Sequence, residues 1–526
     1  MSRADSAPAD KWRVLVCVVF GLFMVILDMT VVNVAFPTIQ RQFAADVNAS
    51  QWVLSLYVMM MGIATPLSGF LADRFGHKRV FLTALTLFAT GSLLCGLAPT
   101  LWLLIGARAI KGIGGGLAMP IGTAMLFEAF PPHERGKALG VFGIALVVAP
   151  ALGPILGGWL VDGGHWRWIF FLNVPIGLVG VILGSLWLRR DSGRGAAAFD
   201  PAGLVFSSIG FGSVLYAASV ASDRGWGSRS VVTWFLVGGA ALLIFALVEL
   251  RLAKAPLLDL RLFKNAIFTW AALTGYVSVI ALFGAEFLMP LYLQLLRGRT
   301  ALEAGVLLLP MAVAAALSAP FSGFLFDRVG ARPLAVVGFS LLAVNTWQLS
   351  LITADTTLRW IGVLLFVRGV ALGLTVQTTM LVSLSVVPLE ETARASALIN
   401  STRQVVQAIG VAVLATILAS SVAPELTAQL RQFQDRMPQG QAAPAGQRFE
   451  LCNLPGPPPV AAPAGIPPQA LGLIKTFCGQ YIDGLERDYK VTFYASLVAV
   501  LLGAILPGWP GKWSGRSAPG PVVSGH

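Results

Sequence analysis

Two copies of one short pattern decide the fold: Ser68-Gly-Phe-Leu-Ala-Asp-Arg-Phe-Gly76 and Ser322-Gly-Phe-Leu-Phe-Asp-Arg-Val-Gly330. Ser, Gly, Phe, Leu, Asp, Arg and the final Gly match in register without a gap. Each copy lies between the second and third apolar segments of a block of six such segments. Two related blocks with weak internal similarity are typical of secondary transporters built from structural repeats.

The composition indicates that lipid covers much of the surface. The chain has 526 residues, of which 56% are hydrophobic and 12% are charged, whereas soluble proteins carry roughly 25% charged residues. Apolar runs of about twenty residues, long enough to cross ~30 Å of hydrocarbon as helices, recur along the chain. The alternating strands of a membrane barrel are absent from the sequence. We therefore expect an all-α membrane protein.

The apolar runs predict about fourteen spans, with ends uncertain by ~2–4 residues. Six fall in each block and two more lie between the blocks. The expected spans are 13–34, 51–72, 80–98, 101–126, 137–161, 168–188, 202–221, 231–250, 268–292, 301–326, 333–353, 358–383, 397–421 and 490–509.

This count divides the chain into a six-helix half at 13–190, a linker with two extra spans at 191–262, and a second six-helix half at 263–509. Lys and Arg gather in alternate short loops, so the positive-inside rule places the N-terminal segment 1–12 and the tail 510–526 in the cytoplasm. A long Pro-rich loop at 422–489 then lies outside. The +12 charge reflects this topology, and we expect no nucleic-acid partner.

The repeated loop has two interpretations. It is either a conformational latch that holds one state of the transporter, or a tight turn that carries cytoplasmic positive charge. Its occurrence in two matching places favours the latch. We expect Asp73 to cap a helix or to pair with Arg135 or Lys137. The latch residues are Gly69, Asp73, Arg74, Gly76, Lys78 and Arg79 in the first copy, and Asp327, Arg328 and Gly330 in the second.

Three charged residues lie well inside apolar runs: Asp28, Arg108 and Glu286. Each costs about 2.5–3.5 kcal/mol at mid-membrane, so each needs a partner or a task. We expect them to carry proton coupling. Alternatively, Asp28 and Arg108 form a structural pair, and Glu286, the only carboxylate expected deep in the second half, pairs with Arg403.

A polar cavity is expected between the two halves, because hydrophilic side chains share one face of the thirteenth span. Glu286 would supply the counter-charge for a cationic cargo. The expected cavity residues are Glu286, Gln377, Asn400, Arg403, Gln407, Trp52 and Tyr57.

Four motifs carry a family resemblance. Gly69-Phe-Leu-Ala-Asp73-Arg74-Phe-Gly76-His-Lys78-Arg79 resembles the signature loop of the major facilitator superfamily, with His77 where that family often has Arg or Lys. Leu27-Asp28-Met-Thr30-Val-Val-Asn33-Val-Ala-Phe-Pro37 is similar to the first-helix motif of its fourteen-span drug:proton antiporter branch. Gly153-Pro154-Ile-Leu-Gly157-Gly158 resembles the antiporter motif of the fifth helix, and Trp166-Arg-Trp-Ile-Phe-Phe-Leu-Asn173-Val-Pro175-Ile-Gly177 is also similar to that branch.

The resemblance implies a major facilitator fold, proton-coupled export of drugs and a role in proton transfer for Arg108. No motif for nucleotide binding, nucleophilic catalysis or a metal cluster occurs in the sequence. We therefore expect a monomeric transporter of the cell membrane with no catalytic residues, no metal and no cofactor, driven by a proton gradient. A lipid, siderophore or metabolite exporter on the same scaffold, and a non-transporting receptor, are the alternatives. Cys452 and Cys478 are either disulfide-bonded or two free thiols.

Overall fold

The computed structural model describes residues 8–189, 191, 200–253, 256–423, 425–426 and 468–508. Within these ranges the side chains at 8–9, 47–48, 223, 283–287, 301, 468–471 and 474 are not described. The described residues form helices and turns, and they contain no strand. The all-α expectation is therefore confirmed.

The first half consists of helices that begin at polar caps and run through apolar sequence. Asp46 accepts a hydrogen bond from the Ala49 N–H at 2.6 Å at the start of the second helix, as expected for an N-cap carboxylate. The helices are α1 (Pro8–Gln42), α2 (Val47–Ala64), α3 (Leu67–Phe75), α4 (His77–Leu97), α5 (Leu101–Ala129), η1 (Pro132–Glu134), α6 (Arg135–Asp162), α7 (Trp168–Phe171) and α8 (Asn173–Trp187).

The linker and the second half continue in the same way. The linker contributes α9 (Pro201–Arg224), α10 (Arg229–Leu247), the π-helical η2 (Val248–Leu252) and η3 (Leu260–Lys264). The second half contains α11 (Ala266–Leu291), the π-helical η4 (Tyr292–Leu296), α12 (Ala301–Val329), α13 (Ala331–Leu349), α14 (Leu358–Thr375), α15 (Thr378–Ser385), η5 (Leu389–Glu391), α16 (Thr392–Ser421) and α18 (Pro468–Ile505).

A helix lies at each of the expected spans, but the count of fourteen is not confirmed. Among the described residues, 11 helices are long and apolar enough to cross a membrane, or 12 if α2 and α3 form one span bent by 51°. Pro66 at this bend lacks the N–H that would continue the helical ladder. The remaining two expected spans coincide with α11 and α13, which do not meet this test over their described residues.

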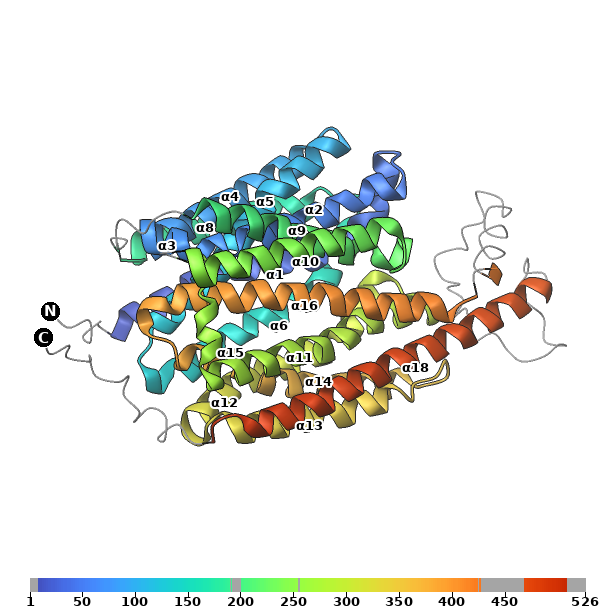
Figure 1. The fold of residues 1–526 in the computed structure, drawn as a ribbon. Coiled ribbons are helices and arrows are strands. Elements are labelled where there is room, and N and C mark those ends of the chain that lie inside the picture. The colour runs from blue at the N-terminus through green and yellow to red at the C-terminus, as the bar shows by residue number, and fades with distance from the viewer. Residues whose placement is uncertain are drawn as a thin grey trace, which may run out of the picture.

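Figure 1 shows the helices as one elongated bundle, with most of the first half above and most of the second half below, while α6 of the first half lies below α16 of the second. Helix α9 packs on α2 and on α16, and α10 packs on α9. The two halves meet where α6 packs along α12 and where α3 and α5 pack on α16. Gly140 allows the close approach of α6, because a Cβ there would lie 2.7 Å from the Ala319 carbonyl oxygen. The start of α1 and the end of α18 lie at the same end of the bundle.

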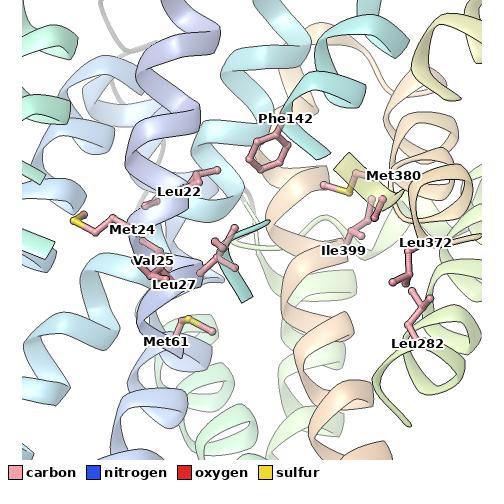
Figure 2. Packing of buried hydrophobic residues seen from close by; sticks show 14 of the residues in the cluster. Leu22, Met24, Val25, Leu27, Met61, Phe142, Leu282, Leu372, Met380 and Ile399 are labelled. Atoms are coloured by element: carbon pink, nitrogen blue, oxygen red, sulfur yellow. The ribbon is translucent and has the colours of Figure 1, made fainter. Parts of the chain in front are cut away.

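Apolar side chains of both halves form a shared core. Figure 2 shows residues of α1 gathered near Met61, and Leu282, Leu372, Met380 and Ile399 of the second half on the other side. Phe142 of α6 lies between these groups and is 3% exposed. In a membrane such packing holds helices together through close contact, since lipid is as apolar as the side chains.

The last helix differs from the sequence expectation. The predicted span began at residue 490, whereas α18 begins at Pro468, so part of the expected outer loop is helical. Lys490 and Glu486 form an ion pair at 2.6 Å one turn apart, and Asp488 is fully buried. The charges that made this segment look like a loop are thus accommodated on a helix. The Pro-rich stretch 454–467 lies outside the described residues.

Candidate functional site

A buried charge network lies at the centre of the first half. The Asp28 carboxylate of α1 accepts hydrogen bonds from Arg108 Nη1 and Lys111 Nζ of α5, each at 2.5 Å. Asn173 Nδ2 of α8 lies 3.4 Å from the same carboxylate. All four side chains are at most 1% exposed. Two cations therefore face one anion in a region where unpaired charge is costly.

Aromatic rings complete the surroundings of both cations. Arg108 lies over the Tyr57 ring at 4.0 Å, and its Nε donates to the Val53 carbonyl oxygen at 3.0 Å. Lys111 lies over Phe88 at 4.7 Å and over Phe170 at 5.2 Å. Ring faces attract cations, and the attraction grows when water is excluded. The rings thus offset part of the excess positive charge.

Glycines of α5 bring α2 close enough to make these contacts. A Cβ on Gly112 would lie 2.5 Å from the Tyr57 carbonyl oxygen, and one on Gly116 would overlap Met61. Only a residue without a side chain permits this approach. The Gly112 and Gly116 spacing seen in the sequence thus explains how α2 supplies Tyr57 and Val53 to Arg108.

The network contains the expected Asp28–Arg108 pair and two residues that the sequence analysis missed as site residues. Lys111 was not counted among the charges inside apolar runs, although it lies well within the expected span 101–126, and Asn173 was noted only within a motif. An i, i+3 relation between Arg108 and Lys111 places both on one helix face. That spacing was the available signal for Lys111.

A cavity of about 580 Å³ lies beside the network, between α1, α2, α5, α9 and α16. This volume falls within the range of about 300–1,000 Å³ that is usual for small-molecule sites. The lining residues Asn33 and Ser219 are exposed, so the cavity is accessible from outside the protein. Arg108 belongs both to this lining and to the charge network.

The expected cavity residues are only partly brought together. Tyr57 and Gln407 line the cavity, together with Gln404, which the sequence analysis missed. Trp52 stacks on Tyr216 with ring centroids 5.4 Å apart and is not among the lining residues.

The other expected cavity residues lie elsewhere. Asn400 donates to the Ser396 carbonyl oxygen at 2.8 Å. Arg403 lines a separate space of about 10 Å³, and Gln377 is 9% exposed beside α6. The side chain of Glu286 lies outside the described residues, so its expected roles stay predictions.

The first copy of the repeated loop forms an ion pair between the halves. Asp73 Oδ2 at the end of α3 accepts a hydrogen bond from Arg394 Nε of α16 at 2.6 Å, and Asp73 is 6% exposed. The expected partners were wrong: Arg135 donates to the Phe127 carbonyl oxygen, and the Lys137 N–H donates to Asp327. The error arose because only tertiary packing places α16 beside α3.

The second copy of the loop makes a reciprocal contact. Asp327 at the end of α12 accepts hydrogen bonds from the backbone N–H groups of Gly136 and Lys137, at 3.1 and 3.2 Å. These N–H groups belong to the first turn of α6, where a carboxylate is favoured by the helix dipole. Asp73 and Asp327, which occupy matching positions in the two copies of the loop, thus each join one half to the other. We call the Asp73–Arg394 pair and the Asp327 cap together the latch.

Glycines end both loop helices in a conformation that other residues rarely adopt. Gly76 and Gly330 have φ values of +87° and +85°. The remaining loop cations lie around these turns: Lys78 donates to the Ser185 carbonyl oxygen at 2.7 Å, and Arg74 and Arg328 lie over Phe75 and Phe324. Arg79 is exposed. A Cβ on Gly69 would lie 3.0 Å from Arg394 Cα, which explains the small residue beside Asp73.

Asp191 fixes the turn after Gly76. Its carboxylate accepts hydrogen bonds from the backbone N–H groups of His77 and Lys78, at 2.5 and 3.2 Å, and lies 3.0 Å from His77 Nδ1. Burial acts to raise the pKa of Asp191, but these hydrogen bonds outweigh it and lower the pKa to about 2. His77, the departure from the family pattern, thus has a local structural partner.

The fifth-helix motif is a seam between α1 and α12. A Cβ on Gly153 would overlap Thr30 of α1, and one on Gly157 would lie 3.1 Å from the Val31 carbonyl oxygen. Gly158 faces the other way, with a Cβ 3.0 Å from the Leu302 nitrogen of α12. Pro154, next to this seam, lies near Gly305 of α12. The motif therefore packs against both halves at once.

The second half contains a buried carboxylate that the sequence analysis missed. Asp488 of α18 is 0% exposed, and neither of its oxygens has a hydrogen-bond partner. The statement that Glu286 is the only deep carboxylate of this half is therefore wrong. It failed because the last span was started after Asp488. Arg368, the counterpart of Arg108 in the repeat, donates to the carbonyl oxygens of Ala281 and Leu282.

Cys478 is disulfide-bonded, whereas Cys17 and Cys95 are free and buried. Cys452 lies outside the described residues, so its pairing with Cys478 stays a prediction.

Comparisons with known proteins agree with this architecture. The family described as Major Facilitator Superfamily matches residues 18–411. The chain is 35% identical over 408 residues to the uncharacterized MFS-type transporter YhcA of Bacillus subtilis, covering 78% of this chain and 76% of the relative. It is 30% identical over 499 residues to a multidrug resistance protein B homolog of Mycobacterium tuberculosis, covering 94% and 88%. The solved proton:xylose symporter XylE superposes with a TM-score of 0.59 at 14% identity, covering 96% and 97%.

Proposed function

This chain belongs to the major facilitator superfamily, a family of transporters and not of enzymes, and we propose that it is a proton-coupled antiporter that exports amphipathic small molecules. The multidrug resistance homolog supports the choice of drug-like cargo. The observation that carries the proposal is the double position of Arg108, which lines the cavity and pairs with buried Asp28.

Arg108 can couple the two events because it takes part in both. A proton that binds to or leaves the Asp28 network changes the charge that faces Arg108. The position of the guanidinium, and with it the cavity wall, then changes with protonation. A cargo that contacts Arg108 biases the same equilibrium, because linkage between two sites is reciprocal. If cargo at Arg108 and a proton on the Asp28 network disfavour each other, each state carries one of the two, and proton and cargo then move in opposite directions through one alternating cavity.

The latch and the cavity indicate which state is described. Asp73 and Arg394 lie near the starts of α4 and α16, whereas the cavity residues of α16 lie a dozen or more positions along that helix. The latch is thus closed at one end while the cavity lies toward the other. Together with the positive-inside charge distribution, this supports an outward-facing state with both termini in the cytoplasm and the chain in the cell membrane.

We further propose that the protein works as a monomer with a small molecule and protons as its partners, in lipid and without nucleic acid. The proton gradient replaces a cofactor, since one charge moved through 100 mV yields about 2.3 kcal/mol. Glu286 remains the proposed second carboxyl for a proton or for a cationic group of the cargo.

Inverted vesicles that hold a pH-sensitive dye test the proposal. Ethidium, a cation, and N-phenyl-1-naphthylamine, an uncharged amphiphile, are added after an inside-acid gradient is formed. We expect probe-dependent proton release from vesicles with the wild type, and its loss in Asp28→Asn. Asp46→Asn is the matched control, because Asp46 is an exposed N-cap and Asn caps helices equally well.

Each result has a defined meaning. Probe transport without proton flux would overturn proton coupling. Proton flux with a lipid, siderophore or metabolite and with neither probe would overturn the drug-like cargo. Loss of flux in Glu286→Gln with ethidium alone supports Glu286 as the counter-charge, and unchanged flux with both probes in that variant refutes its assignment.

A further inference from the structure

The inserted helix α9 lies across the gap between two helices of different halves. It packs on α2 of the first half and on α16 of the second half. On the α2 side, Trp52 stacks on Tyr216 at 5.4 Å. On the α16 side, Trp226 Nε1, just after α9, donates to Thr416 Oγ1 at 2.7 Å. Figure 1 shows α9 running beside α2 along the bundle.

The inner face of α9 is part of the cavity lining. Leu215, Ala218, Ser219 and Ser222 contribute to it. The neighbouring face of α16 adds Ala408, Val411, Ala412 and Ala415, and the amides of Gln404 and Gln407 lie nearer the start of that helix. The side chains from α9 and from 408–415 are uncharged and small or apolar, and the two serines add hydroxyl groups. The α9 side of the cavity therefore has the character of a subsite for an uncharged group.

The side of the cavity formed by α1, α2 and α5 carries its charge. Arg108 lies there with the polar side chains of Asn33, Gln51 and Tyr57, beside the apolar Met29, Leu54, Val58 and Met61. A cavity with a charged and polar group on one side and an uncharged face on α9 is complementary to an amphipathic molecule. Apolar surface removed from water on the α9 side adds binding energy, while the amides and Arg108 fix the orientation.

We propose that α9 is a third wall of the substrate site, in addition to the two six-helix halves, and that it binds the aromatic or aliphatic part of an amphipathic cargo. This inference rests on the proposed function, because it assigns the cavity to cargo. The inserted helix α9 is then part of the binding site and not merely a connection between the halves. Ser219 is the position at which this inference can be tested, because its side chain is exposed and lines the cavity.

Thiol labelling tests the wall without any assumption about proton coupling. Full-length protein in lipid nanodiscs carries Ser219→Cys, or Ile209→Cys as the control on the lipid-facing side of α9. Ile209 is 43% exposed and is not a lining residue. Among the residues that the structure describes, the free thiols of Cys17 and Cys95 are buried, which keeps their background labelling low. A charged, membrane-impermeant maleimide should label Ser219→Cys at least about tenfold faster, since thiols in lipid stay protonated and unreactive.

A probe then tests the subsite. N-phenyl-1-naphthylamine should slow labelling of Ser219→Cys. Ser219→Trp should weaken binding of this probe, measured by its fluorescence without a gradient, by at least about tenfold, because the indole fills the subsite. Ile209→Trp should bind the probe as the wild type does. Melting curves of both Trp variants identify misfolding, and the labelling comparison stands independently of them.

Two outcomes would overturn the inference. Equal labelling of the two cysteines would mean that α9 does not face an aqueous cavity. Fast labelling of Ser219→Cys with no protection by the probe, and wild-type probe affinity in Ser219→Trp, would mean that the wall takes no part in binding. Failure of the proposed function has a different signature, which is probe binding and protection without probe-dependent proton flux.

Discussion

Removing the Asp73 charge should shift the protein away from the state with the closed latch. In Asp73→Asn the ion pair to Arg394 is lost, while the size of the side chain is kept. The pair joins the two halves at 2.6 Å, and Asp73 and Arg394 have side chains that are 6% and 19% exposed. A hydrogen bond between charged groups at this level of burial contributes about 1.5–3 kcal/mol.

That free energy translates into a population ratio. If the pair exists only in the state described, its loss reduces the ratio of outward-facing to inward-facing molecules by about 10- to 150-fold. Nitroxide labels on Phe75→Cys and Leu389→Cys report this ratio, because both positions are exposed and flank the latch on opposite halves. Pulsed electron paramagnetic resonance should show a longer distance gaining population in Asp73→Asn.

The double variant separates the ion pair from other effects. Arg394→Gln should produce a similar shift by itself, and should add little in the Asp73→Asn background, because partners of one interaction are not additive. The Asp327 cap is left intact in all of these proteins. Distance distributions that do not change in Asp73→Asn, or two shifts that add fully, would refute the latch.

Four further results are expected. Asp28→Asn leaves two buried cations without a carboxylate and should cost about 3–5 kcal/mol, so a melting temperature equal to that of the wild type would contradict the charge network. Gly153→Ala should lower the melting temperature because its Cβ overlaps α1, whereas Gly106→Ala, with nothing within 4 Å, should not; equal effects would exclude the seam. Asp488→Leu should melt at or above the wild-type temperature, because this carboxyl has no partner and an apolar side chain removes its desolvation cost; marked destabilisation would show that the carboxyl is bound. Asp191 has a pKa lowered to about 2 in the folded state, so the stability that its ionised carboxylate contributes is present above the unfolded pKa of about 3.9 and is lost as the pH falls towards 2. Asp191→Asn should therefore lower the free energy of unfolding by about 1–2 kcal/mol at pH 7 and by little at pH 2. Thermal melting at the two pH values measures this difference.

The repeat illustrates what could be predicted about the site. Asp73 and Asp327 were recognisable because the same residues recur in matching places. Their partners were not recognisable, since Asp73 meets Arg394 across 321 positions of sequence. No local pattern reports a contact between two halves that are far apart in the sequence. The error over Arg135 and Lys137 has this cause, because both lie at the start of α6, which is nearer to Asp73 in the sequence than α16 is.

The buried charges were also only partly predictable from the sequence. Asp28 and Arg108 were evident because each interrupts an apolar run, and insertion cost is a property of the run itself. Asp488 was missed because it precedes the expected start of its span at residue 490, and Lys111, although inside the span 101–126, was not recognised as a buried charge. The packing of α1 and α4 against α5, and of α13 against α18, extends burial over these residues. Span boundaries are the least certain part of a sequence prediction.

Three properties could be predicted from the amino-acid sequence alone: the chain crosses a membrane as helices, it has two related halves, and a few charges inside them need partners. These properties depend on stretches of about twenty residues, whose cost of transfer into lipid is a local sum. Three other features became visible only in the folded protein. Arg394 joins the second half to Asp73 of the first half, Arg108 borders a cavity, and α9 forms one wall of that cavity. These features depend on the angles and contacts at which distant helices pack, and glycines and prolines far apart in the chain set those jointly.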